Sequence, residues 1–301
     1  MTDPLIMSCG EAVTDRMILP DGSHADFAGG AAVNSAIALT RLGTAAGFLG
    51  ALSTDPEGRA LQSVLRREEV DLQCASYSDH PSTIATVSMT ARGPVFDFRD
   101  DNSAGRTLDG TALKPVPPSV QALLFGGISL IAETSGSVFE ALMARHAGTH
   151  LVYLDLNIRP TLIDRDQPYL ARLKRMIAMA DIIKVSDEDL EYIDPGPFAA
   201  AGALIVNTRG AQGVRACYNG SAHWVPAAPC VVVDTLGAGD IFNAGVLSEL
   251  CRLNALSGPA LKSLSEQDLT QVLKFANHVA GISVTRAGAD APTRQEITCA
   301  P

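Results

Sequence analysis

The chain has 301 residues and a net charge of −10, with 47% hydrophobic and 19% charged residues. This composition allows a large core, and the absence of a basic stripe leads us to expect neither nucleic acid nor an anionic membrane as a partner. The six cysteines are scattered without metal-ligand spacing, and no signal peptide or long apolar span is visible. We therefore expect a cytoplasmic protein with reduced thiols.

The first part of the chain predicts strands and helices, followed by a segment of different character. The apolar pattern predicts strands at 5–9 and 46–49 and helices at 31–42 and 56–68. Around Gly93-Pro94, apolar and polar residues alternate, which predicts a hairpin of strands 83–89 and 95–99 outside the main sheet. We expect residues 12–27 to join this small sheet.

From residue 120 onward, strands and helices alternate regularly. We expect strands at 121–125, 151–155, 181–185 and 203–207, and helices at 135–146, 168–179 and 187–193. This alternation predicts right-handed βαβ units and a parallel sheet covered on both faces. Asn219-Gly220 predicts an antiparallel hairpin over 214–225, and the last helices are expected at 239–253 and 267–285. No polar linker interrupts the pattern, so we predict one α/β domain over residues 1–301.

The most informative run is DTLGAGDIFNAG, at residues 234–245. An apolar stretch, 229–233, precedes it and predicts a buried strand, whereas the residues after it predict a helix. The turn Gly237-Ala238-Gly239 therefore opens a helix, where free N–H groups and the helix dipole favour an anion.

Asp240 carries the wrong charge for merely holding phosphate at this turn. A carboxylate beside an anion site suits the removal of a proton from a hydroxyl that attacks a phosphoryl group. A helix cap would also explain an Asp here. However, Asp234, Thr235 and Asn243 surround the motif with polar groups that a cap does not need.

Several other polar or small residues follow predicted strands. Ligands of parallel sheets lie beyond the carboxyl ends of the strands. We therefore expect one site built from distant segments: Asp15, Gly29-Gly30, Asn157, Thr208-Arg209-Gly210 and Gly237–Asp240.

These motifs resemble those of the ribokinase-like (PfkB) sugar kinases. DTLGAGDIFNAG is similar to their C-terminal signature, and the N-terminal one is matched by GGAAVNSAIALTRLG at 29–43. Further resemblance lies in DLNIRP (155–160), KVSDEDL (184–190), NTRGAQGV (207–214) and FANHVAGISVTRAGADAPTRQEI (275–297). FDFRDDNSAGR (96–106) and GGISLIAETSGS (126–137) are most similar to segments of bacterial fructokinases. The resemblance implies a three-layer fold, with a small β-sheet lid from about 12–27 and 83–105.

The resemblance also implies roles for individual residues. Asp240 would be the catalytic base, and the turn Gly237, Ala238 and Gly239 would stabilise charge on the transferred phosphoryl. Sugar contacts are expected from Asp15, Gly29, Gly30 and Asn34, with Asn157 and Arg159 near the transferred group. Ribokinase has a Lys after its Gly-Gly, where this chain has Ala31, which argues against ribose.

Arg99 and Arg106 have two interpretations. Either could bind the carboxylate of an acidic sugar such as 2-keto-3-deoxygluconate. Alternatively, both are surface charges near Asp100 and Asp101.

The resemblance implies that the nucleotide is bound by Lys184, Asp189, Thr208, Gly210, Gly213 and Asn277. Ser186 replaces the family's usual Asn, which leaves the water-mediated magnesium role of Asp189 open. A monovalent-cation loop would contain Asp234, Leu236, Ser283 and Gly288, although not all members need potassium.

The sequence thus predicts ATP-dependent phosphorylation of a primary hydroxyl of a small sugar, with Mg²⁺, and fructose as the leading substrate. Two alternatives stay open: a 2-keto-3-deoxygluconate kinase, and a catalytically silent sugar- or nucleotide-binding regulator. The resemblance also implies a homodimer formed through the lid.

Overall fold

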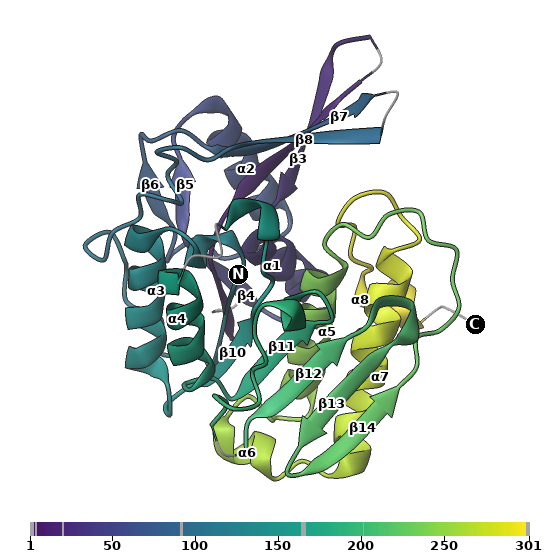
Figure 1. The fold of residues 1–301 in the computed structure, drawn as a ribbon. Helices are drawn as coiled ribbons and strands as arrows, with labels where there is room; N and C mark the ends of the chain where they lie inside the picture. Colours follow the sequence, from purple (N-terminus) through teal and green to yellow (C-terminus); the bar gives the residue numbers. More distant parts are fainter. Residues whose placement is uncertain are drawn as a thin grey trace.

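A computed structural model describes residues 3, 5–19, 21–90, 93–163, 167–200 and 202–298. Its centre is an eight-stranded sheet (Figure 1), in which the strands from β12 to β4 run parallel and β13 and β14 are antiparallel. The order is β14 (Ser221–Val225), β13 (Val214–Tyr218), β12 (Leu204–Thr208), β11 (Ile182–Ser186), β10 (Leu151–Asp155), β9 (Ala122–Gly126), β1 (Ile6–Cys9) and β4 (Ala46–Leu49).

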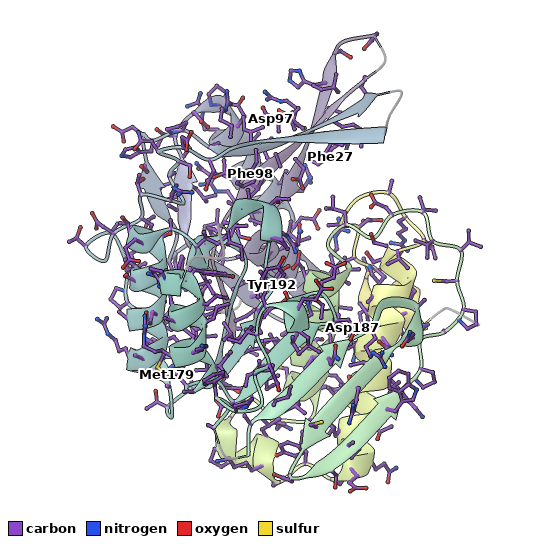
Figure 2. All side chains as sticks on the ribbon, in the orientation of Figure 1. Phe27, Asp97, Phe98, Met179, Asp187 and Tyr192 are labelled. Atoms are coloured by element: carbon purple, nitrogen blue, oxygen red, sulfur yellow. The ribbon has the colours of Figure 1, made fainter. Side chains whose placement is uncertain are left out.

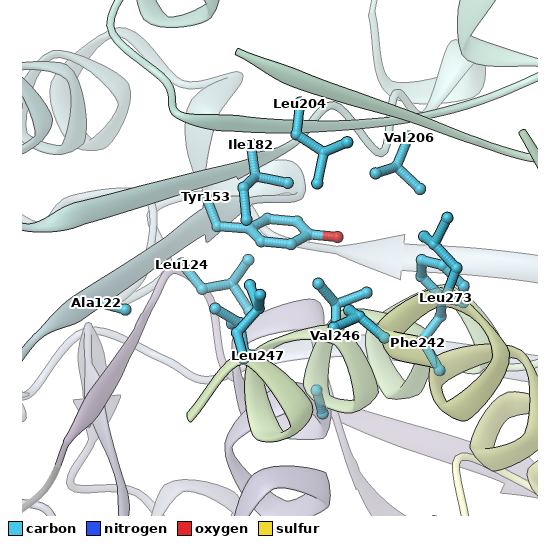
Figure 3. Packing of buried hydrophobic residues seen from close by; sticks show 14 of the residues in the cluster. Ala122, Leu124, Tyr153, Ile182, Leu204, Val206, Phe242, Val246, Leu247 and Leu273 are labelled. Atoms are coloured by element: carbon cyan, nitrogen blue, oxygen red, sulfur yellow. The ribbon is translucent and has the colours of Figure 1, made fainter. Parts of the chain in front are cut away.

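Helices cover both faces of this sheet, which confirms the three-layer expectation. Alternate residues of each strand point to opposite faces, so Ile6 joins one buried cluster and Met7 the other. The first cluster includes α1 (Ala31–Arg41), α5 (Ala238–Arg252) and α7 (Glu266–Ser283), and the second α3 (Glu133–His146) and α4 (Gln167–Ile177). In Figure 3, the ring of Tyr153 lies between Ile182 of the sheet and Leu247 of α5.

A second sheet stands away from the central one, as the alternating segments predicted (Figure 1). Its order is β3 (His24–Gly29), β2 (Val13–Ile18), β7 (Thr83–Thr90) and β8 (Gly93–Arg99). We call these four strands the lid sheet. Arg16 of β2 pairs with Asp26 of β3 at 2.7 Å and with Glu57 of α2 (Pro56–Arg67) at 3.1 Å. The lid sheet is therefore tied to the body of the protein on one side.

The remaining elements are short. β5 (Ala51–Ser53) and β6 (Ser76–Ser78) form a two-stranded parallel sheet. The helices α6 (Gly258–Lys262) and α8 (Arg294–Thr298) complete the C-terminal part.

Two predicted elements are wrong. Residues 229–233 form no strand, and Val231, Val232 and Val233 are 80%, 57% and 62% exposed. The hairpin β13–β14 already forms that edge of the sheet, so this apolar run pairs only at its end, where Val233 N donates to Val284 O. Cys230 is exposed with it.

The predicted helix at 187–193 is only a 3-10 turn, Asp189–Glu191. The Asp189 side chain accepts hydrogen bonds from the backbone N–H groups of Ile158 and Ser186. These bonds fix the segment as a loop rather than a helix.

Candidate functional site

The turn before α5 has the geometry that its small residues predicted. Gly237 is the N-cap and has φ +70°, a left-handed conformation that glycine adopts without strain. The N–H of Ala238 donates to Thr235 O, at 3.2 Å. The amides of Gly239 and Asp240 lie in the first helical turn, where the helix itself offers no acceptor. The anion site therefore centres on these two amides.

Asp240 is a buried carboxylate, only 7% exposed, at this helix end. Its Oδ2 accepts one hydrogen bond, from Asn34 Nδ2 of α1, at 2.9 Å. Burial raises the pKa of Asp240 to about 7, and the charge of Asp155 acts in the same direction. Asn34, Lys184 and Arg159 act against this shift of the pKa. Asp240 is thus a carboxylate poised to exchange a proton near neutral pH.

Lys184 brings a positive charge to the same place. A Cβ on Gly239 would lie 3.0 Å from Lys184 Nζ, so the ammonium lies directly beside the turn. Lys184 forms an ion pair with Asp155 at 3.0 Å, and both side chains are buried. Burial lowers the pKa of Lys184, but Asp155 and Asp189 outweigh it and the net shift is upward. Lys184 is therefore charged at neutral pH.

Asp155 and Asn243 are site residues whose contacts the sequence did not predict. Asn243 Nδ2 donates to Asp155 Oδ2 at 2.7 Å, and Tyr153 OH donates to Asn243 Oδ1 at 2.9 Å. This buried chain fixes Asp155, which in turn holds Lys184. A charged residue at the end of the wholly buried strand LVYLD was the available signal, because a buried charge needs a partner.

The residues expected to bind sugar lie together, and Asn34 connects them to Asp240. Asp15 is opposite Phe27 in the β2–β3 pair, and a Cβ on Gly29 would collide with the Asp15 carboxylate. Burial raises the pKa of Asp15 to about 6. Gly30 is the N-cap of α1, which carries Asn34. The structure therefore brings Asp15, the glycine pair and Asn34 to one place.

Glu11 is a further buried residue that the sequence did not single out. Its carboxylate accepts hydrogen bonds from Ala31 N at 3.0 Å and Ser129 N at 3.1 Å. An acidic residue two positions after a buried strand was a signal for it, but its partners lie far away in the sequence.

Asp189 also lies at the site, but its carboxylate is fully engaged. Oδ1 accepts from Ile158 N at 2.7 Å, and Oδ2 accepts from Ser186 N and Ser186 Oγ at 2.7 and 2.8 Å. Asp189 is 2% exposed. Its visible role is to join the loop after β10 to the end of β11.

Asn157 and Arg159 both lie in the segment that follows β10. Arg159 follows β10 and is exposed, and its charge lowers the pKa of Asp240. Asn157, with φ +40°, lies two residues after the end of β10.

Arg99 and Arg106 are not brought to the site. Strand pairing sets Asp15, Ala85 and Phe98 on one face of the lid sheet, and Arg99 on the opposite face. Arg106 pairs with Asp100 at 3.3 Å. In Figure 2, Phe27 of β3 and Phe98 of β8 mark the lid sheet, and Asp187 marks the segment after β11.

The expected nucleotide residues form a second region, beside β12. Thr208 is opposite Ser186 at the ends of two parallel strands. Gly210 has φ +51° and open space around it, whereas a Cβ on Gly213 would collide with Val225 O. Asn277 Nδ2 donates to Val225 O at 3.1 Å. Gly213 and Asn277 therefore both hold the end of β14.

Asp234 links two segments of the expected cation loop. Its Oδ1 accepts from Leu236 N and its Oδ2 from Gly288 N, each at 2.9 Å. Ser283 Oγ is buried and has no hydrogen-bond partner among the residues that the structure describes. A buried hydroxyl without a partner calls for an explanation, and a bound ion is one that the expected cation loop supplies.

The described residues offer neither a metal cluster nor a membrane-spanning helix. No group of three or more His, Cys, Asp and Glu residues in that part of the chain could hold a metal ion. Among the helices in the described ranges, none has the length and apolar character needed to cross a membrane.

Comparison with known proteins gives a consistent result. The model of the pfkB family carbohydrate kinases matches residues 5–296. A fructokinase of Rhizobium leguminosarum bv. trifolii is 38% identical over 278 residues, 88% of this chain and 85% of that protein. The structure of a fructokinase with bound ATP from Xylella fastidiosa is 26% identical and aligns with a TM-score of 0.89, covering 97% of this chain and 96% of that one. A fructokinase of Vibrio cholerae O395, in a form with fructose, ADP and calcium ion, is 25% identical with a TM-score of 0.81, and each chain is covered to 97%.

The family match spans nearly the whole chain, and the relatives are covered over most of their own length. The glycine turn, the buried carboxylate of Asp240 and the buried Lys184 lie together, at the carboxyl end of β11. The chain belongs to the pfkB family of carbohydrate kinases.

Proposed function

We propose that this protein is a fructokinase, which transfers the γ-phosphoryl group of ATP to a primary hydroxyl of fructose. The names of the relatives support fructose, and the family supports the phosphotransfer. The observation that carries the chemistry is Asp240, a buried carboxylate with one hydrogen bond, next to the N-terminus of a helix and a buried lysine.

In the proposed reaction, Asp240 accepts the proton of the attacking hydroxyl. The hydroxyl oxygen forms a bond to the γ-phosphorus while the bond to the bridging oxygen breaks, and ADP leaves. The amides of Gly239 and Asp240 and the ammonium of Lys184 stabilise the charge on the transferred group. Proton abstraction by a positioned base typically contributes about 10²–10⁴-fold to the rate.

Asp15, Gly29, Gly30 and Asn34 would bind the sugar, with Asn157 and Arg159 toward the transferred group. All the sugar hydroxyls of fructose are neutral, and a carboxylate with an amide can bind such groups. An acidic sugar would need a cation, but Arg99 faces away from Asp15 and Arg106 already pairs with Asp100. This arrangement favours fructose over 2-keto-3-deoxygluconate.

The nucleotide would lie along Thr208, Gly210 and Gly213, with Asn277 bordering it and Lys184 at its phosphates. Mg²⁺, when bound with ATP, would neutralise phosphate charge. It usually keeps several waters and needs few protein ligands, which fits a site whose Asp189 is already occupied by three hydrogen bonds. Asp189 would then act by holding Ser186 and Ile158 in place.

A potassium ion would be held by the loop of Asp234, Leu236, Ser283 and Gly288. The unpartnered Ser283 hydroxyl supports this. Such an ion would fix the loop that leads into the turn at Gly237.

We further propose that residues 1–301 work as one kinase domain, whose lid sheet excludes water from the site. The lid exposes Phe27 and Met17, 54% and 46% exposed, which supports dimer formation through it. Dependence on ATP supports action in the cytoplasm.

The test is a coupled assay of ADP release with fructose, 2-keto-3-deoxygluconate and ribose. We expect fructose to have the highest kcat/KM. If the acidic sugar exceeds it by about tenfold, equivalent to about 1.4 kcal/mol in transition-state binding, the substrate assignment is wrong. Arg159→Gln, with Arg99→Gln as control, would then identify the cation that binds the carboxylate.

A further inference from the structure

Glu11 lies two residues after the end of β1 and is 5% exposed. Its carboxylate joins two distant segments of the chain. Oε1 accepts from Ala31 N, the first residue of α1, and Oε2 accepts from Ser129 N in the 3-10 helix Ile128–Leu130. One side chain thus caps the N-terminal ends of two helices.

The charge of Glu11 is stabilised by these amides rather than by a cation. No Lys or Arg in the described part of the chain forms an ion pair with it. Burial raises the pKa of Glu11 above its ordinary value, and the hydrogen bonds from Ala31 and Ser129 offset only part of that rise. The partial positive charge at a helix N-terminus also favours the carboxylate. This bridge requires an acceptor at both oxygens, because each faces an N–H group.

On one side, Glu11 fixes the start of α1. A Cβ on Gly30 would lie 2.8 Å from Glu11 O, so the two backbones are in close contact. Asn34 N donates to Gly30 O at 2.9 Å, and the side chain of Asn34 donates to Asp240 at 2.9 Å. The path from Glu11 to the carboxylate of Asp240 therefore runs through a single helical turn.

On the other side, Glu11 fixes the turn after β9. Gly127 has φ +78°, and a Cβ there would collide with the Glu11 carboxylate. The preceding residue, Gly126, is opposite Asp155 in the β9–β10 pair, and Asp155 holds Lys184. Glu11 therefore lies between the segment that carries the expected sugar contacts and the segment that supports the lysine.

We propose that Glu11 is a positioning residue for phosphoryl transfer, which holds the first turn of α1 so that Gly29, Gly30 and Asn34 keep their places beside the sugar and Asp240. This role rests on the proposed function, because it assumes that the sugar binds at that turn. Glu11 itself touches neither reacting group.

The kinetic test compares Glu11→Gln with Glu249→Gln. Glutamine has one carbonyl oxygen, and its NH₂ group would face one of the two N–H groups. We expect kcat/KM for fructose to fall about tenfold or more, mainly through a higher KM for fructose, while the KM for ATP changes less than about twofold. Glu249 is a matched control, since it is buried at 3% exposure on α5 and accepts hydrogen bonds from Arg252 and Gln271. Unchanged fructose KM in Glu11→Gln, or an equal rise in Glu249→Gln, overturns the proposal.

A second readout does not depend on turnover. Hydrogen exchange of the peptides that cover 29–35 and 127–131 should be faster in Glu11→Gln than in wild type, and unchanged in Glu249→Gln. If exchange in both peptides stays at the wild-type rate, Glu11 does not position this turn, whatever the substrate. If wild type phosphorylates no sugar, the proposed function fails instead. Should Glu11→Gln not fold, Glu11→Asp keeps the charge but is one methylene too short to reach both amides, and the same shifts are expected of it.

Discussion

Asp189 and Asp240 are two buried carboxylates of the same site that differ in their hydrogen bonds. Asp189, after β11, accepts three hydrogen bonds from neighbouring groups. Asp240, at the start of α5, accepts one hydrogen bond from the described part of the chain, and burial raises its pKa to about 7. A carboxylate with its oxygens occupied holds loops together, whereas one with unused lone pairs can accept a proton. The comparison separates a carboxylate that holds the scaffold, Asp189, from the one that we propose as the base, Asp240.

The largest expected effect is on turnover. Asp240→Asn keeps the shape of the side chain but removes the proton acceptor, so kcat should fall by about 10²–10⁴-fold. Binding of ATP, measured by calorimetry, should persist. A variant with more than about a tenth of wild-type kcat would mean that Asp240 does not act as the base.

The second prediction concerns stability and uses the same substitution. The folded-state pKa of Asp240 is raised above its ordinary value of 3.8. The ionised form therefore destabilises the fold: the penalty is absent below about pH 4, grows as pH rises, and is complete above pH 7, at no more than about 4 kcal/mol.

Asp240→Asn should therefore unfold at a higher urea concentration than wild type at pH 8, and the difference should shrink at pH 4. A variant less stable than wild type at pH 8 would indicate that the carboxylate is a structural group like Asp189.

Asp189→Asn should lower the stability of the protein and affect kcat less than Asp240→Asn does. An amide loses part of the acceptor capacity that serves Ile158 and Ser186, so the free energy of unfolding should fall by about 2 kcal/mol. Among folded molecules, kcat should fall less than in Asp240→Asn. Equal losses of kcat in the two variants would remove the distinction between scaffold and base.

The smallest effect concerns the loop that leads to the turn. Replacing potassium with tetramethylammonium should lower kcat or raise the KM for ATP, by about threefold or more. Ser283→Ala should reduce this response, because it removes the unpartnered hydroxyl. Equal activity in both salts would exclude a cation role for Asp234 and Ser283.

Periodicity in the sequence was sufficient to predict the layers and the small second sheet, and the small residues of the GAG run predicted the turn at Gly237. Periodicity failed at 229–233, because an apolar run shows that a strand could form but not whether a neighbouring strand is free to pair. It also could not find the partners of buried charges. Asn34 and Asp240 are 206 residues apart, and the bridges made by Glu11 and Asp155 exist only once the strands are ordered.

The central claim is that Asp240 is the base, and the pH dependence of kcat/KM for fructose tests it most directly. Because Asp240 must be deprotonated to accept a proton and its pKa is about 7, kcat/KM should fall about tenfold for each pH unit below 7, with a plateau above it. A profile that stays flat from pH 8 down to pH 5 would contradict the account.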